Sequence, residues 1–418
     1  MSNLNFKTTK LACYTAYFTM SSIFCVPPIL FVTFRELYGI SYTLLGTLVL
    51  VNFFTQLGVD LLFTAFSKHF NAKIMVRIMP IATALGLITY ALIPTFFSNI
   101  AYIGLLIGTV IFSISAGLSE VLLSPVIAAI PSDNPQRDMS LLHSLYAFGT
   151  FTMIILSTAF LKTFGANNWM YLIIFLALLP LVAAVMFMLS PMPSLNNDAE
   201  KSNSYGDTNH RAIGLALCVA CIFFGSCSEN AMSNWISTYM ENALGISKVI
   251  GDVLGAAMFA ILLGIARISY AKFGKNIIRT LLISMICAAI CYITAGLSQS
   301  VVIAFIACIM TGLCTSMLWP GTLIMMEENI PNAGVAAFAL MASGGDFGAS
   351  LSPQLIGIVV DKVSATSFAV DLGSRLNITA EQVGLKVGML VTAIFPILGI
   401  IVVLVIKRFF KKSKVINN

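Results

Sequence analysis

Twelve apolar runs, each of about 20 residues or more, occupy most of this 418-residue chain. Hydrophobic residues make up 58% of the sequence and charged residues only 10%, which excludes an ordinary water-soluble protein. A helix needs about 20 consecutive apolar residues to cross a bilayer. The sequence therefore predicts an all-α integral membrane protein with twelve transmembrane helices. The runs cover residues 9–34, 43–66, 74–96, 100–130, 140–163, 168–190, 212–241, 248–270, 277–298, 301–326, 333–360 and 386–407.

One break in composition divides these runs six to six. Between Ser190 and Arg211, Pro, Ser, Asn and charged residues replace the apolar pattern, as in a flexible linker. We therefore expect an N-terminal six-helix bundle over 1–190, a cytoplasmic linker over 191–211, and a C-terminal six-helix bundle with a basic tail over 212–418.

A short internal repeat predicts that the two bundles are pseudo-symmetric. GLSEVLLSP begins at Gly117, and GLCTSMLWP begins 195 residues later at Gly312. Duplicated membrane bundles are typical of secondary transporters. The copies differ in one informative position, because Glu120 of the first copy corresponds to Thr315 of the second. A carboxylate is costly inside a bilayer, so Glu120 is a candidate functional residue.

The distribution of Lys and Arg predicts the orientation of the chain. With both termini in the cytoplasm, 17 of the 23 basic residues lie on the inner side and 6 on the outer side. The net charge of +6 therefore reflects topology and does not indicate nucleic-acid binding. The tail from Lys407 to Lys414 should rest on anionic lipid. We expect a multi-pass protein of the plasma membrane, specifically a bacterial cytoplasmic membrane, since only the Asn-Ile-Thr at Asn377 suggests a secretory pathway.

The sequence contains no pattern typical of an enzyme, a metal site or a bound cofactor. All nine cysteines fall in apolar runs, where they are expected to be small packing residues. The sequence has no Gly-rich phosphate loop, nucleophile elbow or soluble ATPase domain. We therefore expect no enzymatic activity and no cofactor, and energy supplied by an ion gradient.

Polar residues recur on single faces of the predicted helices. Asn52, Gln56 and Asp60 are spaced i, i+4, i+8, which places them on one helix face. Such faces are costly against lipid and should point into the bundle or a wet cavity. Three further stripes are Ser226, Glu229, Asn230 and Ser233; Glu120 and Ser124; and His143, Tyr146 and Thr150.

Three longer segments carry a resemblance to a known family. They are GLSEVLLSPVIAAIPSDNPQRDMSLLHSLYAFGTF over 117–151, FFGSCSENAMSNWISTYM over 223–240, and GDFGASLSPQLIGIVVD over 345–361. These segments resemble the fourth and fifth, seventh and eleventh helices of the fucose permease-like branch of the major facilitator superfamily. That branch consists of sugar:proton symporters, so the resemblance implies alternating-access import of a monosaccharide with protons.

The sequence departs from the pattern of that branch at several positions. Residues 66–73 and 270–276 stand where the superfamily has a Gly-acidic-basic loop motif, but both lack the acidic residue. The run over 11–34 has no Asp or Glu to pair with a fourth-helix Glu, and Ser124 replaces a common Asn. The identity of the solute and the choice between protons and sodium therefore stay open.

The polar stripes and the resemblance together give a candidate site. A sugar site needs amides and carboxylates for hydroxyl groups and aromatic rings for the apolar face of a pyranose. The candidate proton-coupling residues are Glu120, Glu229, Asp346 and His143. The candidate substrate-binding residues are Asn52, Gln56, Ser124, Tyr146, Asn230, Trp235, Trp319 and Tyr17. We expect structural or gating roles for Asp60 and Arg267.

Several of these residues also have structural interpretations. Glu120 could form a buried hydrogen bond, and Glu229 could pair with a basic residue across the halves. Asp346 lies among glycines that could form a hinge, and His143 could be a packed histidine. Asp252 is expected to be a charge at a helix N-terminus. Pro27 and Pro28 should kink the first helix, and Pro125 and Pro320 the fourth and tenth.

The predicted function is import of a small polar solute, most simply a monosaccharide, by a monomer that couples to protons. The many Phe and Met residues also fit a proton-driven efflux antiporter of amphipathic compounds. An alternative of another class is a lipid scramblase that accumulates no solute. The expected partners are the solute, protons or sodium, and the lipid bilayer.

Overall fold

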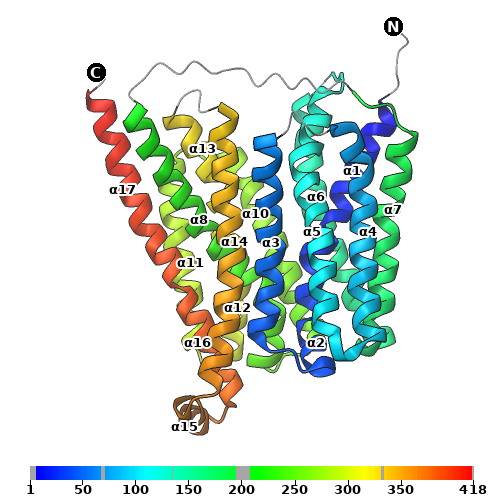
Figure 1. Cartoon of the computed structure of the whole chain (residues 1–418). Helices are drawn as coiled ribbons and strands as arrows, with labels where there is room; N and C mark the ends of the chain where they lie inside the picture. The colour runs from blue at the N-terminus through cyan, green and yellow to red at the C-terminus, as the bar shows by residue number, and fades with distance from the viewer. Residues whose placement is uncertain (1–5, 67–70, 134, 194–207, 331–333, 417–418) are drawn as a thin grey trace. The chain divides into compact units, whose positions relative to one another are not determined.

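The computed structural model describes residues 6–66, 71–133, 135–193, 208–330 and 334–416. Helices account for nearly all of these residues (Figure 1), and each of the twelve apolar runs folds as helix. The prediction of an all-α membrane protein is therefore confirmed.

The chain divides into two compact units. The first comprises 1–40 and 51–198, and the second comprises 41–50 and 199–418. The boundaries thus differ from the expected 1–190 and 212–418, since residues 41–50 group with the second unit. Within the expected linker, residues 194–207 lie outside the described residues.

The first unit is built from the helices of the first six apolar runs. They are α1 (Lys7–Ile29), α2 (Phe31–Tyr38), the greater part of α3 (Tyr42–Phe66), α4 (Ala72–Phe96), α5 (Ala101–Ala129), α6 (Pro135–Phe164) and α7 (Trp169–Leu189), with short 3-10 turns η2 (Ser98–Ile100) and η3 (Ala166–Asn168).

The second unit contains the start of α3 and the remaining helices. They are α8 (Thr208–Thr238), α9 (Lys248–Ile250), α10 (Met258–Phe273), α11 (Ile277–Leu297), α12 (Val301–Thr315), α13 (Leu318–Asn329), α14 (Gly334–Ser364), α15 (Ser367–Leu376), α16 (Ala380–Thr392) and α17 (Ile394–Ile416), with π-helical segments η4 (Tyr239–Ala243) and η5 (Gly251–Ala257).

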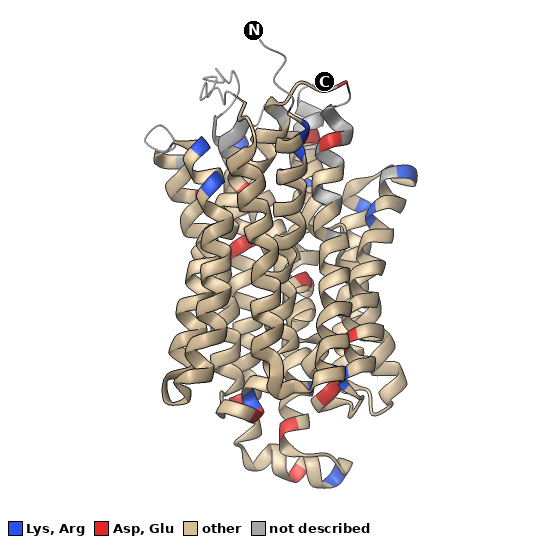
Figure 2. Ribbon diagram, turned by 90° about the vertical axis from the view of Figure 1, so that its right-hand side faces the viewer, with Lys and Arg blue, Asp and Glu red and all other residues tan. Residues whose placement is uncertain are grey.

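Among the described residues, nine helical stretches are long and apolar enough to cross a membrane, and ten if α1 and α2 form one bent span. The other two predicted spans are also helices, α6 with 30 residues and α14 with 31. Within α6, the described residues include a shorter apolar stretch, Phe148–Phe164. Lys, Arg, Asp and Glu gather near the ends of the helices and are sparse along their middles (Figure 2).

Prolines break two of the helices, as predicted, and leave a third continuous. The α1 and α2 axes differ by 50° at a break directly after Pro27 and Pro28. A second break separates α12 from α13 just before Pro320. By contrast α5 runs through Pro125 as one continuous helix. The ring of Pro125 lies only four residues before the end of α5, where few further helical hydrogen bonds are lost.

Small residues bring helices of the first unit into close contact. A Cβ at Gly108 of α5 would lie 2.6 Å from Tyr90 Cβ of α4, and one at Gly86 would lie 2.6 Å from the backbone N of Phe112. Only glycine fits at such an approach, which is a common device in membrane helix packing.

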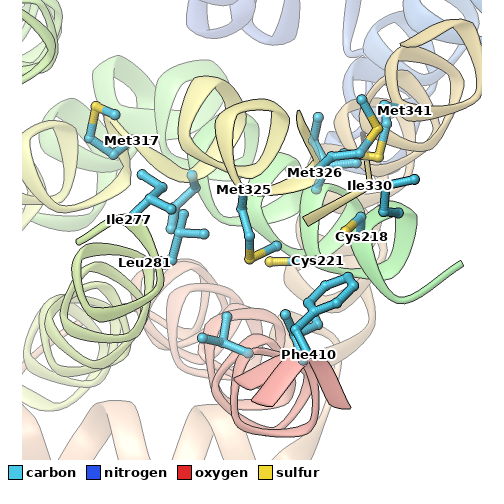
Figure 3. Packing of buried hydrophobic residues seen from close by; sticks show 14 of the residues in the cluster. Cys218, Cys221, Ile277, Leu281, Met317, Met325, Met326, Ile330, Met341 and Phe410 are labelled. Carbon is cyan, nitrogen blue, oxygen red and sulfur yellow. The ribbon is translucent and has the colours of Figure 1, made fainter. Parts of the chain in front are cut away.

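The second unit has a core rich in sulfur-containing side chains (Figure 3). Cys218 and Cys221 of α8 pack there with Met325 of α13, Leu281 of α11 and Phe410 of α17. Met side chains adapt their shape to irregular gaps, so they fill the space where several helices converge.

Candidate functional site

The polar face of α3 is a hydrogen-bonded ladder inside the first unit. Gln56 Nε2 donates to Asn52 Oδ1 at 2.9 Å, and the Ser113 hydroxyl of α5 donates to the same oxygen at 2.7 Å. Asn52, Gln56 and Asp60 are all buried, as their shared helix face predicted. The ladder consists of amide and hydroxyl groups that can exchange these bonds for bonds to a polar solute.

Two carboxylates meet one helical turn beyond this ladder. Oxygen atoms of Asp60 on α3 and Glu120 on α5 lie within 4.8 Å of each other. Gly117 explains the close approach of their helices, since a Cβ there would lie 3.0 Å from Val59 Cβ and 3.3 Å from Gln56 Cα. The first glycine of the repeated GLSEVLLSP element therefore sets the distance at which the Glu120 carboxylate meets its neighbour.

Two ionised carboxylates at this separation repel each other strongly where water is scarce. A single proton held between them removes one charge and the repulsion together. The pair can therefore take up and release a proton. The expectation that Asp60 acts apart from Glu120 did not foresee this pairing, because no local spacing links residues 60 positions apart.

Three aromatic side chains of the first unit pack against one another. Tyr17 of α1 and Tyr146 of α6 pack edge to face with ring centroids 6.5 Å apart, and Phe24 lies 5.8 Å from Tyr146. Tyr17 is buried and Tyr146 half-buried. Ser124 is half-buried on α5. The side chain of His143 lies outside the described part of the chain.

In the second unit, Glu229 and Arg267 form an ion pair. Arg267 Nη2 lies 3.4 Å from Glu229 Oε1, and Arg267 Nε donates to the Ser316 carbonyl at 2.9 Å. From the sequence we expect separate roles for these two residues, or a basic partner for Glu229 in the other half. Its described partner instead belongs to the same unit, joining α8 to α10 and to the residue after α12.

The rest of the α8 stripe follows the predicted spacing. Asn230 Nδ2 donates to Ser226 Oγ at 3.2 Å, one turn earlier on the same face. Asn230 is half-buried.

The two tryptophans proposed as platforms differ in their surroundings. Trp235 is 0% exposed, its indole N–H donates to the Pro353 carbonyl at 3.0 Å, and the Tyr42 ring lies 5.6 Å away. Trp319 is half-buried and packs directly on Gly345, where any Cβ would overlap its ring. Asp346 follows that glycine and is 5% exposed.

A polar cluster joins α8, η4, α9 and η5, and its contacts are not predicted from the sequence. Asp252, expected as a charge at a helix N-terminus, lies in the first turn of η5 and is 0% exposed. It accepts a hydrogen bond from the Ser237 hydroxyl and lies 3.7 Å from Lys248, which also lies 3.6 Å from Glu241. The i, i+4 spacing of Lys248 and Asp252 was the available signal, but burial depends on the packing of α8.

The ends of α1 and α6 form another ion pair. Lys10 Nζ lies 2.5 Å from Asp138 Oδ2, and Ser132 and Tyr14 hydroxyls also donate to this carboxylate. The hydrogen bond from Lys10, followed by the one from Ser132, lowers the pKa of Asp138 below its usual range.

Known structures with the same arrangement of helices are numerous. A bacterial homologue of the human lysosomal transporter Spinster, in an inward-facing and occupied conformation, is similar with a TM-score of 0.74 and 14% identity over 97% of each chain. A D-xylose–proton symporter is similar with a TM-score of 0.73 and 15% identity, over 93% of this chain and 96% of that one. The nucleoside transporter NupG is similar with a TM-score of 0.67 and 15% identity, over 97% of this chain and 98% of that one.

At these identities the three structures establish the fold alone. No curated protein sequence matches the chain. The sequence profile of the Major Facilitator Superfamily, however, matches residues 12–353, which is most of the chain. Together with the helical architecture and the buried polar faces, this match shows that the chain is a multi-pass membrane protein belonging to the Major Facilitator Superfamily.

Proposed function

We propose that this protein is a secondary active transporter that imports a small polar solute, a monosaccharide in the simplest case, together with protons. The observation that carries the proposal is the Asp60–Glu120 carboxylate pair inside the first unit. A buried pair that repels when fully ionised and is relieved by one proton is suited to bind and release that proton during a transport cycle.

Alternating access would couple this proton to the solute. Protonation of the pair removes a net negative charge from the interior of the first unit, which lowers the cost of closing the cavity around a solute. Glu120 carries the proton and Asp60 supplies the neighbouring charge. Asp346 is a further candidate, whereas Glu229 is held by Arg267 and fits a structural role better.

The solute would be held by amides and rings. The Asn52–Gln56–Ser113 ladder and Asn230 offer donors and acceptors for hydroxyl groups. Tyr17, Tyr146 and Trp319 offer ring faces, and Ser124 and His143 complete the set proposed from the sequence. The similarity in fold to a D-xylose–proton symporter supports the proposal that the solute is a sugar. The similarity to a nucleoside transporter makes nucleosides the second class of solute to test.

The positive charges support a bacterial cytoplasmic membrane location with both termini in the cytoplasm, since 17 of the 23 Lys and Arg residues then face inward. We further propose that the protein works as a monomer.

The test is an external pH measurement in lightly buffered, energy-depleted cells that produce the protein. Sugars and then nucleosides are added singly. A true substrate should make the medium more alkaline, and Glu120→Gln should abolish this change while solute exchange persists in part. Glu36→Gln, on the exposed end of α2, is the matched control and should behave as the parent. Gradient-driven accumulation by Glu120→Gln would refute the role of the pair.

A further inference from the structure

The guanidinium of Arg267 is anchored to a carbonyl that a proline leaves without its usual donor. Pro320 has no backbone N–H, so the carbonyl of Ser316, four residues earlier, lacks its helical partner. Arg267 Nε donates to this carbonyl at 2.9 Å. The bond joins α10 to the break between α12 and α13, all within the second unit, and it restrains the orientation of the planar guanidinium.

Glu229 occupies only part of the remaining guanidinium. Arg267 Nη2 donates to Glu229 Oε1 at 3.4 Å and to Glu229 Oε2 at 3.5 Å. Both contacts are long, since charge-assisted hydrogen bonds between such groups usually measure about 2.7–2.9 Å. Among the described residues, no other group lies within hydrogen-bonding distance of Arg267. The two N–H groups of Nη1 therefore remain open to a ligand.

The Arg267 side chain belongs to a stretch that can cross a membrane, yet protein does not enclose it. The stretch is Lys248–Tyr270, and 40% of the Arg267 side chain is exposed, against 20% for Glu229. A guanidinium is costly against lipid, so the exposed part should face a water-filled space that a solute can enter. The bond to the Ser316 carbonyl requires a donor but no positive charge. It therefore does not explain why a charged residue stands here.

We propose that Arg267 binds a carboxylate group of the transported solute. Together with the monosaccharide import proposed above, on which this choice of solute class rests, the substrate is a sugar acid. The edge formed by Nη1 and Nη2 presents parallel N–H groups that match the two oxygens of a carboxylate. One guanidinium balances one negative charge. A carboxylate monoanion therefore fits the site better than a phosphate dianion, whose second charge would stay uncompensated.

Glu229 is the counter-ion of the empty site. It neutralises Arg267 while no solute is bound, and the carboxylate of the solute competes with it for Nη2. Removal of the Glu229 charge should therefore strengthen binding of the anion. An ion pair with a structural role alone predicts no such gain.

The test is isothermal titration calorimetry on the full-length protein in detergent. The ligands are D-glucuronate and D-galacturonate, with D-glucose and D-galactose as neutral counterparts and the corresponding 6-phosphates as dianions. At least one acid should bind about tenfold or more tightly than its neutral counterpart, because hydrogen bonds to charged groups are among the strong ones. A parent protein that binds neither acid, that binds them no better than the neutral sugars, or that prefers a 6-phosphate would overturn the proposal.

Variants locate the carboxylate site. Arg267→Gln should lose the preference for the acid, and Arg267→Lys should keep only part of it, since an ammonium has charge but no planar fork. Glu229→Gln should raise the affinity for the acid severalfold. The double variant Glu229→Gln/Arg267→Gln removes both charges and serves if Arg267→Gln folds poorly. Arg279→Gln, at an exposed residue, is the control. A preference that survives Arg267→Gln, or an affinity that falls in Glu229→Gln, would refute the site.

This binding measurement needs no proton gradient, so it separates the site from the proposed function. Acids that bind the purified protein but cause no alkalinisation of the medium would refute proton-coupled import and leave the Arg267 site in place. Neutral sugars that cause alkalinisation while the acids fail to bind would refute the Arg267 site and leave import in place.

Discussion

The carboxylate of Asp361 accepts a hydrogen bond of 2.6 Å from the backbone N–H of Thr43, although 318 positions separate the two residues. Its other oxygen accepts from the Tyr42 N–H at 3.2 Å. Asp361 on α14 thus satisfies the free N–H groups at the start of α3, and its negative charge faces the positive end of that helix. This contact gives a physical reason for the grouping of residues 41–50 with the second unit.

Replacement of Asp361 should therefore destabilise the protein. We expect Asp361→Ala to lower the free energy of unfolding by about 1–2 kcal/mol, because two N–H groups lose their acceptor. Asp361→Asn should cost less, since the amide oxygen can still accept one of the two bonds. Thermal unfolding in detergent measures the effect. Asp371→Ala on the exposed face of α15 is the control. Equal unfolding midpoints for the Asp361 and Asp371 variants would show that Asp361 does not stabilise the start of α3.

The Asp60–Glu120 pair makes a prediction about transport that is separate from stability. Asp60→Asn removes one of the two charges, so Glu120 no longer needs a proton to relieve repulsion. We expect the variant to exchange labelled solute across the membrane but to lose proton-driven accumulation. Counterflow and uptake in proteoliposomes with an imposed pH gradient distinguish the two activities. An Asp60→Asn protein that concentrates solute as well as the parent would exclude a shared proton.

The Glu229–Arg267 ion pair should show energetic coupling. Glu229→Gln leaves the Arg267 charge without its carboxylate, and the double variant with Arg267→Gln should recover part of the lost stability. We expect a coupling energy of about 0.5–3 kcal/mol in a double-mutant cycle. The same cycle with Arg279→Gln, an exposed residue at the start of α11, should be additive. Additivity in both cycles would show that the 3.4 Å contact contributes no coupling.

The Lys10–Asp138 contact predicts a dependence of stability on pH. Because the pKa of Asp138 is lowered in the folded protein, its contribution is complete above the unfolded value of about 3.9 and disappears as pH falls through the folded value. The unfolding midpoint of the parent should therefore exceed that of Asp138→Asn at neutral pH, and the difference should vanish in strong acid. Asp133→Asn, at an exposed neighbour, should show no such pH-dependent difference.

Trp235 and Trp319 should respond differently to truncation. Trp235→Phe leaves the buried Pro353 carbonyl without its 3.0 Å donor, so we expect a loss of about 1–3 kcal/mol in stability with KM unchanged. Trp319→Phe changes a half-buried ring and should raise KM with a smaller effect on unfolding. Unfolding midpoints and initial uptake rates test both. A raised KM for Trp235→Phe at unchanged stability would restore it as a substrate platform.

The sequence alone determined the class of the protein. Twelve long apolar runs admit little other than a helical membrane protein, because a bilayer leaves backbone groups no partners outside a helix. The spacing of Asn52, Gln56 and Asp60 predicted one polar face because helical periodicity is a local property. Pro27 and Pro28 likewise predicted the break after α1.

Only the tertiary structure decided which of these residues act together. The pairing of Asp60 with Glu120, of Glu229 with Arg267, and of Asp361 with the start of α3 each joins helices far apart in the chain. The burial of Asp252 and the meeting of Cys291 with Cys314 depend on the same helix contacts. Helical periodicity fixes the face of a helix on which a residue lies. Which residue of another helix it contacts depends on close packing at positions such as Gly117. A glycine in the sequence does not indicate which helix will pack against it.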